Sequence, residues 1–337
     1  MKHLFFAEQS YAFSILRPLQ TTLLEQGDEV VWFLFDLPET MLNEGERSLS
    51  TICDVKEYAP DSVICPGNWV PDSFPGLKTQ IFHGFGIEKK GHFKIRGMFD
   101  LYCTHGPITT DWFAGQAKNL GYFDVVETGW PKLDTWIDYI DERDALSTPV
   151  KLLFAPTFSP SLTAAPDLFE VWKQIAAAGK YEVSVKFHPM MDLAVIDTYK
   201  SLECETFKIL SDADILPAMS AADIIISDTS SVITEGLFLA KPILTYKTIA
   251  KGDHIVNFTN PSDLIDLLEE ISTDYPAAKV RGDDFVKNMH PYRDGKSSLR
   301  VRQAIIDQLA KPNLGVRRHP VNLFRKLKIR QKMKPYL

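Results

Sequence analysis

Short apolar runs of strand length alternate with segments of helical period along the chain. The first run covers residues 2–7, a helical pattern follows over 14–26, and a second run covers 29–34, with Gly27 where a helix should end. Further runs of strand length in the first half cover 62–65, 79–82, 101–104 and 124–127. Alternation of this kind predicts a parallel sheet whose strands are joined by crossover helices.

The second half repeats this rhythm. Its predicted strands cover 151–155, 182–187, 223–227 and 242–246, and its predicted helices cover 167–178, 216–221, 231–239, 262–270 and 296–309. A length of 337 residues is too great for one ordinary core, and the polar stretch 141–149 lies between the two repeats. We therefore predict an α/β chain of two Rossmann-like doubly wound domains facing a cleft, which resembles the GT-B architecture. The predicted domains cover 1–145 and 150–310, and a basic tail covers 311–337.

Charge and composition exclude several functions. The net charge is −7, but residues 308–337 hold nine Lys or Arg and no acid, so residues 1–307 carry −16. An acidic body does not suit a nucleic-acid partner. No Gly-x-Gly-x-x-Gly follows the first predicted strand, which argues against a nicotinamide dehydrogenase.

The expected location is the cytoplasm. The four cysteines are scattered and form no Cys-x-x-Cys pair, as suits a reducing compartment. The apolar run at the N-terminus is too short for a signal peptide, and no window holds eighteen uninterrupted apolar residues.

Two histidines end predicted strands, one in each half. His83 is followed by Gly84, which allows a ligand close to the backbone, and His188 follows Lys186 and precedes Pro189. A histidine can act as a base near neutral pH. The alternative for each is a polar residue that merely ends a strand.

Two further motifs lie at predicted helix starts. Residues 227–231 read Ser-Asp-Thr-Ser-Ser where a buried strand turns into a helix, and 294–298 read Asp-Gly-Lys-Ser-Ser before the last helix of the second half. Backbone N–H groups at a helix start favour an anion such as phosphate. Simple helix capping by Asp228 or a serine is the alternative for the motif at 227–231.

The ordered set of motifs resembles the CDP-glycerol glycerophosphotransferases, the teichoic-acid primases and polymerases of the GT-B class. The matching pieces are His83-Gly84, 129–134 (Gly-Trp-Pro-Lys-Leu-Asp), 154–158 (Phe-Ala-Pro-Thr-Phe), 186–189 (Lys-Phe-His-Pro), 227–231 and 294–298. Three positions depart from the family pattern: 85–88 reads Phe-Gly-Ile-Glu, Thr229 replaces a tyrosine, and Lys132 replaces an arginine.

The resemblance implies a reaction and a set of site residues. A polyol-phosphate group, most simply glycerol phosphate, would pass from CDP-glycerol to a hydroxyl of a lipid-linked glycan or teichoic-acid-like acceptor, with release of CMP. It implies that 1–145 is the acceptor side and 150–310 the donor side, with His83 as general base and His188 against the pyrophosphate. The implied donor-binding residues are Gly84, Pro131, Lys132, Pro156, Thr157, Lys186, Asp228, Thr229, Ser230, Ser231, Asp294, Lys296 and Ser297. No Asp-x-Asp clamp stands out, so we expect no tightly bound metal or cofactor, although soluble Mg²⁺ can assist.

The basic tail interleaves apolar and positive residues from 317 to 334, as amphipathic segments on anionic membranes do. We therefore expect a peripheral protein on the inner face of the cell membrane; a disordered basic tail is the alternative. Two other functions remain open. One is a GT-B glycosyltransferase that uses a nucleotide sugar, and the other is a non-catalytic binding or scaffold protein.

Overall fold

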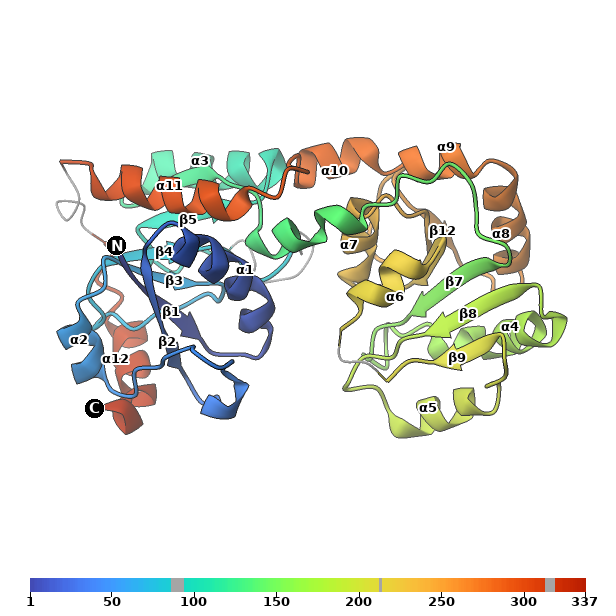
Figure 1. The fold of residues 1–337 in the computed structure, drawn as a ribbon, viewed down its shortest axis with the longest axis horizontal. Coiled ribbons are helices and arrows are strands. Elements are labelled where there is room, and N and C mark those ends of the chain that lie inside the picture. Colours follow the sequence, from blue (N-terminus) through green and yellow to red (C-terminus); the bar gives the residue numbers. More distant parts are fainter. Residues whose placement is uncertain (86–93, 212–213, 313–318) are drawn as a thin grey trace. The chain divides into compact units, whose positions relative to one another are not determined.

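The computed structural model describes residues 1–85, 94–211, 214–312 and 319–337, which form two compact units (Figure 1). Unit 1 comprises Met1–Ile137 together with Asn288–Leu337, and unit 2 comprises Asp138–Lys287. Each unit contains a six-stranded sheet in which every pair of neighbours is parallel. The predicted fold class, with two Rossmann-like α/β domains, is confirmed.

The sheet of unit 1 has the strand order β2-β1-β3-β4-β5-β6. Its strands are β1 (Lys2–Ala7), β2 (Glu29–Leu34), β3 (Ser62–Cys65), β4 (Leu77–Gln80), β5 (Leu101–Thr104) and β6 (Asp124–Glu127). Its α-helices are α1 (Tyr11–Glu25), α2 (Ile52–Tyr58), α3 (Pro107–Leu120), α11 (Ser297–Leu309) and α12 (Leu323–Lys332). Its 3₁₀ helices are η1 (Glu39–Met41), η2 (Pro131–Tyr139) and η3 (Lys334–Tyr336), and the last residues of η2 belong to unit 2.

The sheet of unit 2 has the strand order β12-β11-β10-β7-β8-β9. Its strands are β7 (Val150–Ala155), β8 (Tyr181–Val185), β9 (Phe207–Ile209), β10 (Ile224–Ser227), β11 (Ile243–Tyr246) and β12 (Val256–Phe258). Counted from the first strand of the unit, this is the 3-2-1-4-5-6 order of dinucleotide-binding folds. Its helices are α4 (Ala165–Ala178), α5 (Leu193–Lys200), α6 (Leu216–Ala221), α7 (Val232–Phe238), α8 (Asp263–Thr273), α9 (Tyr275–Val280) and α10 (Asp283–Met289), whose last residues belong to unit 1.

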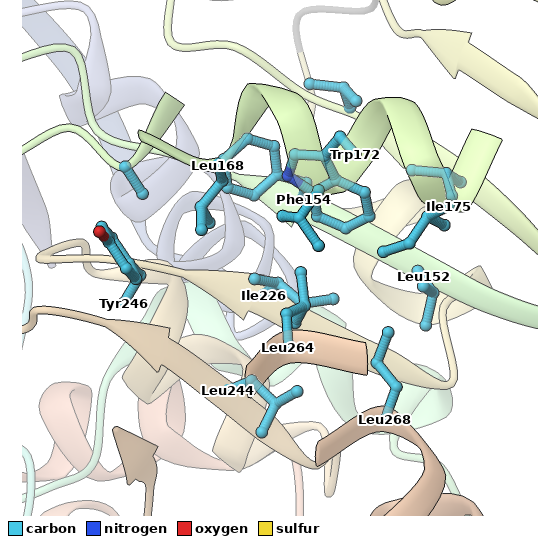
Figure 2. Close-up of a cluster of buried hydrophobic side chains, with 14 of the residues drawn as sticks. Leu152, Phe154, Leu168, Trp172, Ile175, Ile226, Leu244, Tyr246, Leu264 and Leu268 are labelled. Atoms are coloured by element: carbon cyan, nitrogen blue, oxygen red, sulfur yellow. The ribbon is translucent and has the colours of Figure 1, made fainter. Parts of the chain in front are cut away.

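The strands at the centre of each sheet are apolar because helices cover both faces. All four residues of β10 are buried, and so are the last five of β1. In unit 2, Trp172 of α4 packs in one cluster with Phe154 of β7 and Leu264 of α8 (Figure 2). Burial of each such side chain contributes about 1.5–3 kcal/mol, so this cluster holds helices on the sheet.

The start of unit 2 is fixed by a buried ionic network around Asp141. The Asp141 carboxylate accepts hydrogen bonds from Lys241 Nζ at 2.6 Å and from the Arg143 guanidinium at 2.7 Å. Lys241 Nζ also donates to the carbonyls of Ser220 at 2.9 Å and Ala222 at 2.6 Å. Burial tends to raise the pKa of Asp141, but these cationic donors outweigh it and lower the pKa well below its usual range. The predicted boundary segment therefore begins with a residue anchored inside unit 2.

The C-terminal segment corrects the predicted domain limits. Residues 288–310, which we expected in the second domain, belong to unit 1, because α11 packs on α1 and on strands β4 and β5. The tail is not separate either, since Ile329 of α12 and Met333, the residue that follows α12, are buried in the core of unit 1. None of the helices within the described ranges has the length and apolar character needed to cross a bilayer.

Candidate functional site

Each sheet has a point at which the strand order reverses, and ligands of open parallel sheets bind beyond the carboxyl ends of the strands at such points. In unit 1 the reversal lies between β1 and β3, and in unit 2 it lies between β7 and β10. The predicted Pro156 and Thr157 follow β7, and 228–231 follow β10. The two histidines follow the neighbouring strands, His83 after β4 and His188 after β8.

His83 is oriented by the loop that follows β3. Its Nδ1 lies 3.3 Å from the carbonyl oxygen of Pro66. A carbonyl can only accept, so Nδ1 carries the proton and the lone pair of the neutral ring is on Nε2. The ring also stacks on Tyr11, with centroids 5.2 Å apart and planes 29° apart. This tautomer is the one that a general base acting through Nε2 requires.

Glu8 is a candidate that the sequence interpretation missed. It follows the last residue of β1, and its carboxylate accepts a hydrogen bond from the Trp69 indole. Gly67 has no room for a side chain, because the Glu8 carboxylate lies where its Cβ would be. Burial raises the pKa of Glu8, and the Trp69 hydrogen bond only partly opposes this; Glu8 in turn helps to raise the pKa of Tyr11, which stacks on His83. An acidic residue directly after the apolar run Leu4–Ala7 that ends β1 is the signal that could have identified it.

His188 has the opposite tautomer to His83. Its Nδ1 accepts a hydrogen bond from the Met190 N–H at 3.1 Å, so in the neutral ring the proton is on Nε2. The ring packs on Phe158 at 4.4 Å between centroids. Lys186 lies two residues earlier, and the buried residues Val185 and Phe187 alternate with this pair, so Lys186 and His188 share one side of the chain. Two cationic or N–H donors on one side suit an anionic ligand.

We predicted that Asp228 contacts the donor substrate, but its carboxylate is already hydrogen-bonded within the protein. Its side chain is fully buried and accepts the N–H groups of Thr157 at 2.9 Å and Ala164 at 2.9 Å. Burial raises its pKa, and these backbone hydrogen bonds oppose the rise. Asp228 therefore fixes the loop from 156 to 164, which carries the Phe158 ring that packs on His188.

The rest of the motif after β10 lies nearer the surface. Thr229 and Ser230 are partly buried and Ser231 is exposed, while Ser230 Oγ accepts the N–H of Val232 at 3.3 Å. Pro156 is buried and Thr157 is partly exposed. Thr157, Ser230 and Ser231 therefore remain candidate ligand contacts from the two strands beside the reversal.

Asp294, Lys296 and Ser297 are in unit 1 and not in the donor domain where we expected them. The start of α11 is already capped by the protein, because Asp134 accepts the N–H of Ser297 at 2.8 Å and of Ser298 at 2.7 Å. Asp294 pairs with Arg300, and Ser297 is buried. The start of α11 is therefore capped by Asp134, a residue outside the motif, and this carboxylate already occupies the place of an anion.

The motif 129–134 also has a structural role. His290 Nε2 accepts the Trp130 N–H at 2.8 Å, and burial lowers the pKa of His290 to about 4. Gly129 has a φ of 80°, and a side chain there would collide with Ser297. Pro131 is buried, and Lys132 Nζ lies 4.7 Å from the centre of the Trp136 ring. The motif 129–134 therefore packs against His290 and Ser297 within unit 1.

The remaining predicted residues are only partly described. Gly84 follows His83 and is partly buried, but residues 86–93, which complete that motif, lie outside the described residues. In the described part of the chain, no group of three or more His, Cys, Asp or Glu is arranged to hold a metal ion.

Comparisons with known proteins support the fold. A family model of UDP-N-acetylglucosamine 2-epimerase matches residues 153–306. The chain is similar in structure to UDP-GlcNAc 2-epimerase from Neisseria meningitidis bound to UDP-GlcNAc, at 11% identity and a TM-score of 0.66 over 91% of this chain and 100% of that one. The Staphylococcus aureus MnaA–UDP structure matches at 13% identity and a TM-score of 0.63, over 90% and 95%.

The wall teichoic acid polymerase TagF is a third structural neighbour, at 13% identity and a TM-score of 0.64 over 91% of this chain and 89% of that one. A TagF variant soaked with CDPG also matches, at 15% identity and a TM-score of 0.61 over 92% and 90%. No curated protein sequence matches significantly. The chain thus has a GT-B-related fold that epimerases and a teichoic-acid polymerase share.

Proposed function

We propose that this protein transfers glycerol phosphate from CDP-glycerol to a hydroxyl of a lipid-linked envelope glycan or teichoic-acid-like acceptor. The observation that carries the proposal is the opposite tautomers of His83 and His188, which follow β4 and β8, each the neighbour of a strand that flanks a reversal point. A general base must offer a lone pair, as Nε2 of the neutral His83 ring does. A ligand of phosphate must offer an N–H group, as Nε2 of the neutral His188 ring does. The ordered motifs shared with glycerophosphotransferases support the same reaction.

In the proposed reaction, an acceptor oxygen attacks the phosphorus that bears glycerol. A new oxygen–phosphorus bond forms, the phosphoanhydride bond breaks, and CMP leaves with the bonding electrons. His83 Nε2 takes the proton of the attacking hydroxyl. Little covalent chemistry falls to the protein, so positioning and charge stabilisation dominate.

The donor pyrophosphate is assigned to unit 2. Lys186 and the His188 Nε2–H supply charge and a donor, and Thr157, Ser230 and Ser231 supply hydroxyl groups. Asp228 supports these groups indirectly by fixing the loop that carries Thr157. Hydrogen bonds to charged groups typically contribute about 1.5–3 kcal/mol each, so a few contacts are enough for a donor site.

Donor selectivity tests the proposal. CDP and CDP-glycerol should stabilise the protein against heat more than UDP or UDP-GlcNAc at equal concentration. A ligand at 100 times its Kd stabilises the folded state by about 2.7 kcal/mol, which is readily measured by thermal shift. The His188→Ala variant is the matched control and should lose most of the shift. An equal or larger response to UDP would refute the CDP-polyol assignment.

Nucleotide-sugar chemistry is the second candidate, and the epimerase family match over residues 153–306 favours it. That candidate predicts a response to UDP-GlcNAc and a product that keeps or transfers a sugar. Mass analysis of the released nucleotide separates the two, because glycerol-phosphate transfer releases CMP.

We propose that the Glu8 carboxylate forms a hydrogen bond with the acceptor substrate, which is the donor of that bond. The variant Glu8→Gln tests this role. Glutamine keeps an oxygen for Trp69, so we expect a folded variant with a higher KM for the acceptor and an unchanged Kd for the donor. Because burial raises the pKa of Glu8, ionisation opposes folding. Wild-type stability should therefore fall as pH rises above about 4.5, the ordinary range of a glutamate, and this part of the fall should be absent in the variant.

Urea unfolding of both proteins between pH 4 and pH 8 measures the difference. A variant that is no more stable than wild type at pH 8 would contradict a raised pKa for the partly buried Glu8 carboxylate. If the KM for the acceptor is unchanged, Glu8 does not contact the acceptor substrate. The raised pKa of Glu8 would not be contradicted by that result.

A further inference from the structure

The helix α12 has two apolar faces, and only one of them packs on the protein. Ile329 and Met333 are buried in the core of unit 1. Phe324 is 88% exposed, Leu323 59% and Leu327 53%. Figure 1 shows α12 near the C-terminal end of the chain, and the buried cluster that Ile329 joins also contains Ile52 and Val55 of α2.

Helical geometry separates the two faces. Successive residues turn by about 100°, so Leu323, Phe324 and Leu327 fall within one sector and Ile329 and Met333 fall on the opposite side. The outward sector holds a bulky aromatic and two leucines, each of them more than half exposed. We call Leu323, Phe324 and Leu327 the outer face of α12.

The charge around the outer face has one sign. Residues 319–337 contain six Lys or Arg and no Asp or Glu. Lys328 and Lys334 are exposed, and Arg330 is exposed although it pairs with Asp72 at 2.9 Å. Arg325 is held by the Arg96 carbonyl, which fixes the start of the helix to the body of unit 1.

We propose that the outer face of α12 docks on an anionic lipid bilayer. A bilayer offers negative headgroups to the lysines and hydrocarbon to Phe324 and the leucines in one surface. A second copy of this chain would bring like charges together at the same face. The inference does not depend on the proposed reaction, because lipid binding can be measured without any substrate.

The inward face makes truncation a poor test. Removing residues 317–337 would expose the core that Ile329 and Met333 cover, so it would unfold part of unit 1 as well as remove the docking face. Substitutions on the outer face avoid this difficulty, because those side chains are already exposed.

The experiment is co-sedimentation of the full chain with vesicles of phosphatidylcholine alone or with added phosphatidylserine. Wild type should bind the anionic vesicles, and 0.5 M salt should weaken the binding. The double variant Phe324→Ser/Leu327→Ser should bind at least about tenfold more weakly, since burial of even one large apolar side chain corresponds to roughly tenfold or more. The variant Lys328→Glu/Lys334→Glu should also bind about tenfold or more weakly. Each positive charge near an anionic surface strengthens binding, and this variant loses two of them.

Matched controls are Leu193→Ser, an exposed leucine of α5, and Lys118→Glu, an exposed lysine of α3; neither should change vesicle binding. All variants should unfold at the wild-type urea concentration. The proposal is overturned if wild type ignores anionic vesicles or if the outer-face variants bind like wild type. A wild-type dimer that Phe324→Ser dissociates, without vesicle binding, would assign the face to a second copy instead.

Discussion

Replacing His83 with alanine should lower the rate of glycerol-phosphate transfer by about 10²–10⁴-fold while donor affinity stays near wild type. A positioned base contributes that much when its lone pair meets the proton of the nucleophile. The Pro66 carbonyl fixes Nδ1 as the protonated nitrogen, so only Nε2 of the neutral ring can accept. Single-turnover rates and donor titration on the purified variant measure the two quantities separately.

His188→Ala is the counterpart, and its pattern should differ. Loss of an N–H donor to a charged pyrophosphate should weaken donor binding about ten- to a hundredfold as well as reduce turnover. Wild-type turnover in His83→Ala would remove the proposed base. Loss of donor binding in His83→Ala and not in His188→Ala would exchange the two roles.

Asp141→Ala should destabilise unit 2 by about 3–5 kcal/mol. The Lys241 ammonium is 1% exposed, and among the described residues the loss of Asp141 would leave it the carbonyls of Ser220 and Ala222 as hydrogen-bond partners. Breaking a buried ion pair from one side leaves an uncompensated charge, which is the costly case. The depressed pKa of Asp141 means that this contribution is present at neutral pH and is lost only in strong acid, as pH falls below about 4.

The double variant Asp141→Leu/Lys241→Met is the control, because replacing both partners by apolar groups of similar size often restores stability. Since two units need not unfold together, amide hydrogen exchange in β7 and β10 is a better measure than a single melting curve. Unchanged exchange in Asp141→Ala would show that the network does not hold unit 2.

The strands could be predicted from sequence almost to the residue where both faces are buried. The limits expected for β1, β2, β3 and β5 match those observed, because these strands are largely buried apolar runs between polar turns. Those of the partly buried edge strand β6 match as well. Short helices such as α2 and α5 escaped notice, since seven or eight residues carry too little periodic signal. The apolar residues of α12 could be recognised in the sequence. Which of them face the core depends on packing against segments that are distant in sequence.

The site could be predicted only in part. His83 and His188 stood out because a polar residue ends an apolar strand, but their tautomers are set by Pro66 and Met190, whose backbone positions no pattern reveals. Ser297 was assigned to a ligand because its cap, Asp134, lies 163 positions away in sequence. Asp228 was interpreted as a donor contact because its backbone partners, Thr157 and Ala164, lie 71 and 64 positions away in sequence.

The discontinuity of unit 1 has a consequence for biosynthesis. Unit 2 is complete once Lys287 has been made, whereas unit 1 needs Asn288–Leu337 to supply α11 and α12. Domains usually fold in the order of synthesis, but here the inserted domain has all its residues first. The N-terminal sheet must therefore remain without α11 and α12, with the surfaces they cover exposed, until residues 288–337 have been made and have left the ribosome.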